Sequence, residues 1–410
     1  MVEALSNRRV ALAHHWLMGM RGGEKTLEHI ARLVGEAPVY ALLAQPDRLS
    51  EELRRRPIHT SFLDRVPAIR RRYRMLLPLM PKAADRMDLT DYDVVICSDA
   101  AVAKGMRCAP DALKICYCHS PMRSVWDLYV QHRREAGLVG GAVLAASVKR
   151  LRRRDRAAAD TVSAFVANSY NVRNRIRRSY GRGAVVIYPP VELAEAPAAT
   201  DPEDFYLVVS ELVGYKRVDL AVEACTRDSR RLVVIGDGPQ MSLLRKLAGP
   251  TVSLLGYQDD AVVRNHMRRC RAFLFCGEED FGLTPVEAQS FGRPVIAYGH
   301  GGACETVLDG QTGLWFQTTS PEAVAEAIER FEEEGGDLWP PDRIAAHARG
   351  FAAARFRDRF ERFLEWCLAE HDRAGPEGVA RAMESLPADR FLTMGERAIG
   401  TDDRGSEPRP

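Results

Sequence analysis

The sequence predicts an α/β protein built from two doubly wound parallel-sheet domains. Short, continuously apolar runs alternate with helix-length intervals along most of the chain, which is typical of parallel strands covered by helices on both faces. At 410 residues the chain is long enough for two domains of ordinary size. A polar, Ala- and Pro-rich segment without periodicity, residues 192–203, separates two series of apolar runs and is interpreted as a linker.

The first series of apolar runs predicts the strands of an N-terminal domain, residues 1–191. After the first of them come three glycines and a stretch with helical spacing, residues 24–34. The predicted strands are residues 9–15, 92–98, 113–119, 161–169 and 184–188.

The second series predicts a C-terminal domain, residues 204–350. Its predicted strands are residues 205–210, 231–236, 252–255, 272–276 and 294–298. Aromatic residues and leucines at helical spacing predict a last helix at residues 351–371. We interpret residues 372–410 as a polar tail. Parallel sheets bind ligands at the carboxyl ends of their strands, so a site between two facing domains is expected.

Composition excludes several classes of protein. Apolar residues make up 46% and charged residues 28%, which is ordinary globular usage and excludes a disordered or collagen-like chain. No apolar run is long enough to span a membrane, and the first nine residues are polar, so we expect a cytoplasmic protein. The nine cysteines lack zinc-site spacing and are expected to be reduced thiols.

The charge is distributed unevenly. Residues 1–190 hold 33 Lys and Arg against 18 Asp and Glu, a net charge of +15, whereas the whole chain carries +2. An anionic membrane and nucleic acid would both attract the first half, but no nucleic-acid reader motif or aromatic stacking platform accompanies the charge, so nucleic acid is not expected. Apolar residues 137–148, followed by basic residues 149–156, favour the membrane surface. The candidate membrane- and acceptor-side cations are Arg71, Arg72, Arg152, Arg153 and Arg154.

Two glutamates frame the densest motif of the sequence. Glu279 and Glu287 have seven residues between them, directly after a predicted strand. Gly282 permits close backbone approach, and the helix expected after it would offer its first amides to an anion such as a diphosphate. Downstream are a Gly-x-Pro-Val-Ile-Ala strand, residues 292–297, and a Gly-Gly-x-x-Glu loop, residues 301–305.

With the upstream segments 213–219 and 236–239, these motifs make the C-terminal half similar to the nucleotide-sugar domain of family 4 retaining glycosyltransferases. The resemblance implies a GT-B fold, in which two Rossmann-like domains face each other across a cleft and the helix expected at residues 351–371 returns to the first domain. It also implies that Lys216 neutralises the leaving diphosphate, Glu287 binds the ribose and Glu279 contacts the transferred hexose. Glu211 departs from the family, because many relatives have an arginine there.

The N-terminal half shares the resemblance. Residues 20–25 follow the first strand and open a helix, but Glu24 between Gly23 and Lys25 breaks the P-loop spacing, so an ATPase is not expected. Residues 119–123 look like the His-x-Pro-Met-Arg segment of bacterial mannosyltransferases, which implies that His119 touches the sugar. The catalytic candidates are Glu279, Lys216 and His119, and the donor-binding candidates are Gly22, Gly23, Lys216, Phe281, Gly282, Leu283, Thr284 and Glu287.

The resemblance implies a retaining hexosyltransferase that needs no metal or other cofactor. Mannose from GDP-mannose is the expected donor, and a polyprenyl-diphosphate-linked saccharide at the cytoplasmic membrane face is the expected acceptor. Two alternatives stay open: a transferase that uses a UDP-sugar, and a catalytically silent nucleotide-sugar-binding protein. A dehydrogenase is not expected, because residues 236–238 lack the third glycine of the dinucleotide-binding motif.

Overall fold

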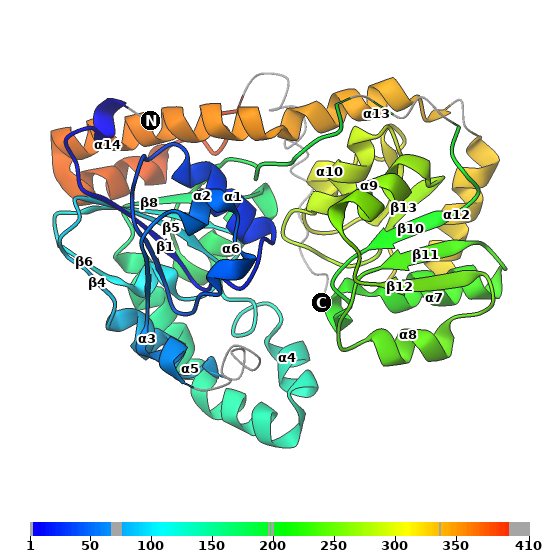
Figure 1. Cartoon of the computed structure of the whole chain (residues 1–410), viewed down its shortest axis with the longest axis horizontal. Coiled ribbons are helices and arrows are strands. Elements are labelled where there is room, and N and C mark those ends of the chain that lie inside the picture. The colour runs from blue at the N-terminus through cyan, green and yellow to red at the C-terminus, as the bar shows by residue number, and fades with distance from the viewer. Residues whose placement is uncertain (1–2, 67–75, 196, 198–200, 336–337, 393–410) are drawn as a thin grey trace. The chain divides into compact units, whose positions relative to one another are not determined.

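The computed structural model describes residues 3–66, 76–195, 197, 201–335 and 338–392 (Figure 1). The chain divides into two compact units. The first unit comprises Met1–Pro190 together with Ala354–Thr393, and the second comprises Val191–Ala353. Each unit is a parallel sheet with helices on both faces, so the predicted fold class is confirmed.

The sheet of the first unit has seven strands in the order β3-β2-β1-β5-β7-β8-β9, and every neighbouring pair is parallel. Its central strands are buried along their whole length, which is why they read as continuous apolar runs. The strands are β1 (Val10–His14), β2 (Val39–Ala41), β3 (Ile58–Thr60), β5 (Val94–Asp99), β7 (Leu113–Cys118), β8 (Ala164–Ala167) and β9 (Val185–Val186). A small second sheet pairs β4 (Asp88–Leu89) with β6 (Arg107–Cys108).

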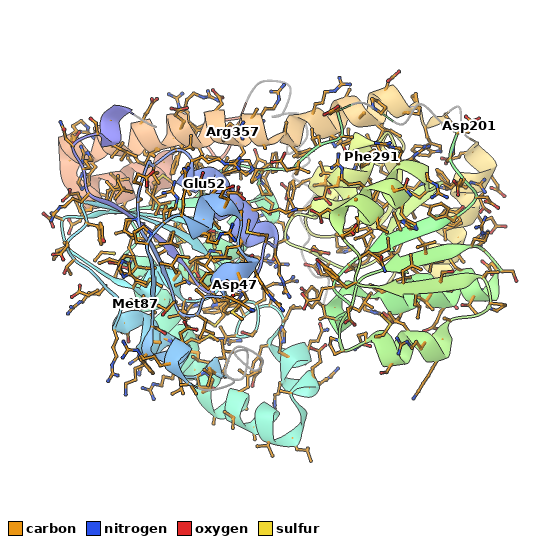
Figure 2. All side chains as sticks on the ribbon, viewed as in Figure 1. Asp47, Glu52, Met87, Asp201, Phe291 and Arg357 are labelled. Carbon is orange, nitrogen blue, oxygen red and sulfur yellow. The ribbon has the colours of Figure 1, made fainter. Side chains whose placement is uncertain are left out.

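Helices cover both faces of this sheet. The core on one face is built with α1 (Gly22–Ala31), α2 (Glu51–Arg54) and α14 (Ala353–Ser385). The core on the other face is built with α3 (Met80–Asp85), α5 (Gly137–Asp160) and α6 (Tyr170–Tyr180), and α4 (Tyr129–Glu135) packs against α5. Arg357 of α14, labelled in Figure 2, lies 3.1 Å from Nδ1 of His29 on α1.

The end of the chain differs from the prediction of a polar tail after residue 371. Helical structure runs on to Ser385 after a break at Gly375, where φ is 67°. Val379 and Met383 are buried in the first unit's core, and Phe391 joins them. The prediction was wrong because Gly375 and Pro376 are typical of a helix end, whereas here they mark a kink after which apolar residues return to the same core.

The second unit has a six-stranded parallel sheet in the order β12-β11-β10-β13-β14-β15. The strands are β10 (Tyr206–Val209), β11 (Leu232–Ile235), β12 (Val252–Gly256), β13 (Ala272–Phe275), β14 (Val295–Tyr298) and β15 (Gly313–Phe316). The core on one face includes α7 (Val218–Arg227), α8 (Met241–Leu247) and α12 (Pro321–Glu334). The other face has α9 (Asp260–Arg269), α10 (Leu283–Ser290) and α11 (Ala303–Thr306), and α13 (Pro341–Ala348) packs against α10.

Both sheets change winding direction at one point. In the first unit this switch lies between β1 and β5, and in the second between β10 and β13. Loops that leave the carboxyl ends of the two strands beside such a switch diverge to opposite faces of the sheet and leave a crevice for ligands. The order of the strands therefore locates one candidate ligand crevice in each unit.

Candidate active site

Lys216 and Glu279 form an ion pair at the switch point of the second unit. Lys216 ends the short helix η7 (Gly214–Lys216) after β10, and Glu279 lies in the loop after β13. Their side chains are 15% and 21% exposed, so both are accessible to a ligand. Two residues 63 positions apart in the sequence are thus brought together by the strand order.

Close backbone packing fixes these loops. A Cβ atom added at Gly277 would lie 2.7 Å from Cα of Lys216. One added at Gly302 would lie 2.3 Å from Cα of Phe281, and the Gly302 N–H donates to the carbonyl of Glu279 at 2.8 Å. The Gly-Gly loop therefore holds the Glu279 loop in place, which explains why the two motifs occur together in the sequence.

The helix α10 begins beside Glu279. Gly282 precedes it with φ 94° and ψ 81°, a conformation that favours glycine. Leu283 and Thr284 form the first turn, whose amides have no carbonyl partner within the helix and favour an anion. Glu287 lies one turn further on and is partly buried.

The Phe281 side chain is buried, whereas a side chain that contacts the donor would be accessible. Its side chain is 3% exposed and packs edge-on against Phe351 at 5.5 Å between ring centroids. The ring belongs to the core of the second unit, so a contribution of this residue to the donor would come from its backbone.

In the first unit, Gly23 and His119 meet at the corresponding edge of the sheet. Oγ of Ser98 and Nε2 of His119 share a hydrogen bond of 2.8 Å, and the His119 N–H donates to the carbonyl of Asp99. A Cβ atom at Gly23 would lie 3.4 Å from Cε1 of His14 and 3.7 Å from Nε2 of His119. Gly22, next in sequence, begins α1, so the glycines keep a small space free over two imidazoles.

His14 and His15, at the end of β1, are held in the neutral form. Burial, and then the neighbouring His15 and His119, hold the pKa of His14 well below its usual range. Burial lowers the pKa of His15 to about 4. Sequence reasoning missed both residues, although their position at the end of the first predicted strand was a signal, because strand ends line the crevice.

Glu24 follows the two glycines and is almost fully buried. Burial raises the pKa of its carboxyl group to about 7, and the carboxyl accepts a hydrogen bond from the Arg21 N–H at 3.2 Å. A carboxyl group with this pKa exchanges a proton near neutral pH. It stands at the start of α1, the helix on which the first unit presents Gly22 and Gly23.

A buried ionic network supports the segment that carries His119. Nζ of Lys104 lies 2.6 Å from Oδ1 of Asp155 and 3.3 Å from Oδ2 of Asp99. Asp155 also accepts hydrogen bonds from Nε1 of Trp126 at 2.7 Å and from the Tyr180 hydroxyl at 2.8 Å. Burial works against the charged form of Lys104, but Asp155, Tyr180 and Asp99 raise its pKa well above the usual range.

Sequence reasoning missed this network entirely. The signal was Asp155, the one carboxylate within a run of arginines in residues 150–156. The network links the buried end of β5 to α5 and α6, and through Trp126 to the loop that begins at His119. It therefore positions one wall of the first unit's crevice.

The candidate membrane- and acceptor-side arginines differ in their contacts and exposure. Nε of Arg152 donates to the carbonyl of Val125 at 2.6 Å, and its guanidinium lies over the Trp126 ring. Arg154 pairs with Asp85 at 2.6 Å, whereas Arg153 is exposed. Arg152 therefore holds the loop after His119, and the membrane- or acceptor-side role of these arginines stays a prediction. Arg71 and Arg72 lie outside the described residues.

No group of three or more potential metal-ligating side chains occurs within the described part of the chain. Glu211, the departure from the family pattern, is partly buried in the loop after β10, where the Ser210 hydroxyl donates to its carbonyl oxygen at 3.1 Å. The crevice of the second unit therefore offers one ammonium group, a helix start and carboxylates. This set suits a diphosphate joined to hydroxyl-bearing sugars.

Two doubly wound domains with such a crevice define the GT-B class, and comparisons with known proteins agree. The family model "Glycosyltransferase Family 4" matches residues 20–195, and the model "Glycosyl transferases group 1" matches residues 192–349. The chain belongs to the GT-B glycosyltransferase family.

Curated relatives are similar over parts of the chain. An uncharacterised glycosyltransferase of Methanocaldococcus jannaschii is 28% identical over 169 residues, 40% of this chain and 48% of the relative. A GDP-mannose-dependent phosphatidylinositol monomannoside mannosyltransferase of Mycolicibacterium smegmatis is 28% identical over 206 residues, 42% of this chain and 52% of the relative. A glycogen synthase of Xanthomonas campestris is 32% identical over 134 residues, 30% of this chain and 28% of the relative. The chain thus spans about half or less of the length of these relatives.

Solved structures share the fold over most of the chain. The Anabaena protein HepE in complex with UDP-glucose superposes with a TM-score of 0.64 at 17% identity, covering 87% of this chain and 99% of that one. The lipopolysaccharide outer core galactosyltransferase WaaB gives a TM-score of 0.60 at 18% identity, with coverage of 87% and 99%.

Proposed function

We propose that the protein is a retaining hexosyltransferase that moves mannose from GDP-mannose to a polyprenyl-diphosphate-linked oligosaccharide in exopolysaccharide or lipopolysaccharide assembly. The observation that carries the proposal is the Lys216–Glu279 pair beside the first turn of α10, at the switch point of the second unit. The mannosyl specificity is supported by the His-Ser-Pro-Met-Arg segment at His119 and by the similarity to a GDP-mannose-dependent relative.

The chemistry requires charge placement more than a strong base. As the bond to the sugar breaks, negative charge grows on the diphosphate and positive charge on the sugar ring. Lys216 and the amides of Leu283 and Thr284 would stabilise the first, and the Glu279 carboxylate would stabilise the second. Glu287 would accept hydrogen bonds from ribose hydroxyls, and His119 would orient the hexose. In this arrangement the ammonium group and the amides take the place of a metal ion.

A UDP-sugar transferase is the second candidate. It is favoured by the structural similarity to HepE, which was solved with UDP-glucose, and to a galactosyltransferase. The loops described above engage diphosphate and ribose, which both donors share, so they support either base.

A donor panel tests the proposal. Purified protein is titrated by calorimetry with GDP-mannose, UDP-glucose, GDP, UDP and NAD, and donor hydrolysis is measured in parallel. We expect GDP-mannose and GDP to bind at least tenfold more tightly than the uridine ligands, and the Lys216→Met variant to lose most of this binding. A preference for UDP-glucose would establish the second candidate. Binding without any donor hydrolysis or transfer would indicate a silent nucleotide-sugar-binding protein.

We further propose that the protein attaches peripherally to the anionic inner face of the plasma membrane. Exposed apolar side chains gather on α4 and the start of α5, where Leu138 is 95% and Val139 is 80% exposed. Val130 and Val143 extend this group, and the four residues together form the α5 apolar patch. Further along the same helix, Lys149, Arg150 and Arg153 are exposed and suit lipid phosphates. Among the described residues, no helix is long and apolar enough to cross a bilayer.

Introducing charge into the α5 apolar patch should release the protein from vesicles. A Leu138→Asp/Val139→Asp variant is expected to bind vesicles of phosphatidylglycerol and phosphatidylcholine at least tenfold more weakly, because burial of each side chain contributes roughly 1.5–3 kcal/mol. Co-sedimentation measures the binding. Leu243→Asp, at a 44% exposed leucine on α8, is the matched control and should bind like the wild type. Equal vesicle binding by the double variant and the control would show that the α5 apolar patch does not contribute to membrane attachment.

A further inference from the structure

The first unit contains a cavity whose lining includes none of the candidate catalytic or donor-binding residues. It has a volume of about 630 Å³ and lies between α3, α5 and the kink of α14. Its floor includes Lys114 and Ser163, at the amino ends of β7 and β8. His119 and Ser98, in contrast, lie at the carboxyl ends of the strands and are not among the residues that line the cavity. Pockets that bind small molecules typically measure about 300–1,000 Å³.

Within the described part of the chain, Lys114 is a buried cation that has no counter-charge in this cavity. It is 3% exposed, and its Nζ donates hydrogen bonds to the carbonyl of Met106 at 2.9 Å and to Oγ1 of Thr161 at 3.0 Å. Both partners are neutral, and among the described residues no carboxylate forms an ion pair with it. An ammonium group has three N–H donors, and the third bonds the Cys108 thiol, a weak acceptor that an anionic oxygen would replace. Because a buried charge is costly unless it is paired, an anion in the cavity would be strongly favoured.

The other charges in the cavity wall are already neutralised or lie at the rim. Arg107 pairs with Asp88, Arg154 with Asp85, and Asp155 with Lys104. The remaining carboxylates, Asp160 and Glu377, are exposed to solvent. Lys114 is therefore the buried charged group of the cavity wall that has no oppositely charged partner among the described residues.

Most of the remaining wall is apolar. Buried side chains of α5, of the loops around β6 and of the segment after His119 line it. They include Val102, Met106, Met122 and Leu151. A buried cation at the floor of an apolar chamber matches a ligand with one anionic group and an apolar body.

We propose that this cavity is a binding site for an amphipathic anion, with a phosphate or carboxylate on Lys114 and an alkyl or prenyl body against the apolar wall. The site does not depend on the proposed transferase activity. It is distinct from the donor crevice in position and in chemistry, because a nucleotide sugar has no apolar body. The anion can be a single lipid drawn from a bilayer or a soluble metabolite, and the experiment below separates these sources.

Cys108 provides a reporter inside the cavity. Its thiol lines the chamber and is partly exposed, and the Lys114 side chain lies beside it. Burial raises the pKa of the thiol, and the Lys114 ammonium opposes this rise. Every other cysteine except Cys304 is buried, so alkylation of Cys108 can be followed by peptide mass spectrometry with little interference.

The test measures the rate of Cys108 alkylation by iodoacetamide with dodecyl phosphate as the probe, below its micelle concentration. We expect at least tenfold slower alkylation with dodecyl phosphate and no protection by inorganic phosphate or by dodecanol. The Lys114→Gln variant should lose the protection. The matched control Lys82→Gln, at an exposed lysine of α3 outside the cavity lining, should keep it. Calorimetric titration with the same compounds should give the same ranking without thiol chemistry.

A second variant covers the case in which Lys114→Gln fails to fold. Ala157 is exposed at the cavity mouth, so Ala157→Trp should block entry and abolish both protection and calorimetric binding. If anionic vesicles as well as monomeric dodecyl phosphate protect Cys108, the natural ligand is a bilayer lipid. If only the monomer protects Cys108, the natural ligand is a soluble amphiphile. Absence of binding, or equal protection by dodecanol, would overturn the proposal.

Discussion

Replacing Lys216 with methionine should lower kcat about a hundred- to a thousandfold while the protein stays folded. Loss of one preorganised group that stabilises transition-state charge typically costs about 2.7–4 kcal/mol. Lys216 supplies the ammonium group that pairs with Glu279 at the switch point of the second unit, and methionine keeps the length of the side chain without its charge.

The measurement is steady-state sugar transfer or donor hydrolysis with the donor that the panel selects. Lys246→Met, at an exposed lysine of α8 in the same unit, is the matched control and should retain the wild-type rate. Glu279→Gln should show a decrease similar to that of Lys216→Met. A Lys216→Met variant that keeps its thermal transition and turns over within threefold of the wild type would contradict the assigned role.

Replacing Lys104 with methionine should destabilise the first unit by about 3–5 kcal/mol, because removal of one partner from a buried ion pair leaves an uncompensated buried charge. Here two carboxylates, Asp99 and Asp155, would lose their common cation, and both are almost inaccessible to solvent. Urea unfolding followed by tryptophan fluorescence reports the effect, since Trp126 donates to Asp155 directly.

Two further variants isolate the cause. Lys82→Met, at an exposed lysine of α3, should leave the unfolding midpoint nearly unchanged. The double variant Lys104→Met/Asp155→Asn should recover part of the loss, because one of the two orphaned charges is removed. A double variant less stable than Lys104→Met would show that packing, rather than charge, dominates at this position.

The fold and the second unit's crevice were predictable because they depend on local patterns. Strands buried on both faces are continuously apolar, and motifs at their carboxyl ends converge once the strand order is doubly wound. The resemblance to family 4 glycosyltransferases implied that Lys216 and Glu279 share one site, and the strand order explains why their separate loops meet.

Features that depend on long-range side-chain pairing were not predictable. Asp155 lies among arginines on α5, and only the packing of α5 against the sheet shows that its partner is Lys104. The same packing turns Arg152 onto Trp126 instead of toward solvent. The Lys114 cavity is formed by segments from the first and the last parts of the chain, and no local pattern reports such a space.

The first unit is built from two separate segments of the chain, which constrains the order in which the protein can fold. One face of its sheet is covered by α14, whose Phe356, Phe360 and Phe363 are almost completely buried. During synthesis the ribosome must complete the whole second unit before these side chains emerge. Until then, the nascent first unit presents an uncovered apolar face, which is a binding surface for chaperones and a risk for aggregation. An isolated N-terminal fragment that ends at Pro190 has the same exposed face, so the first unit on its own requires the α14 segment, either in cis or as a separate peptide.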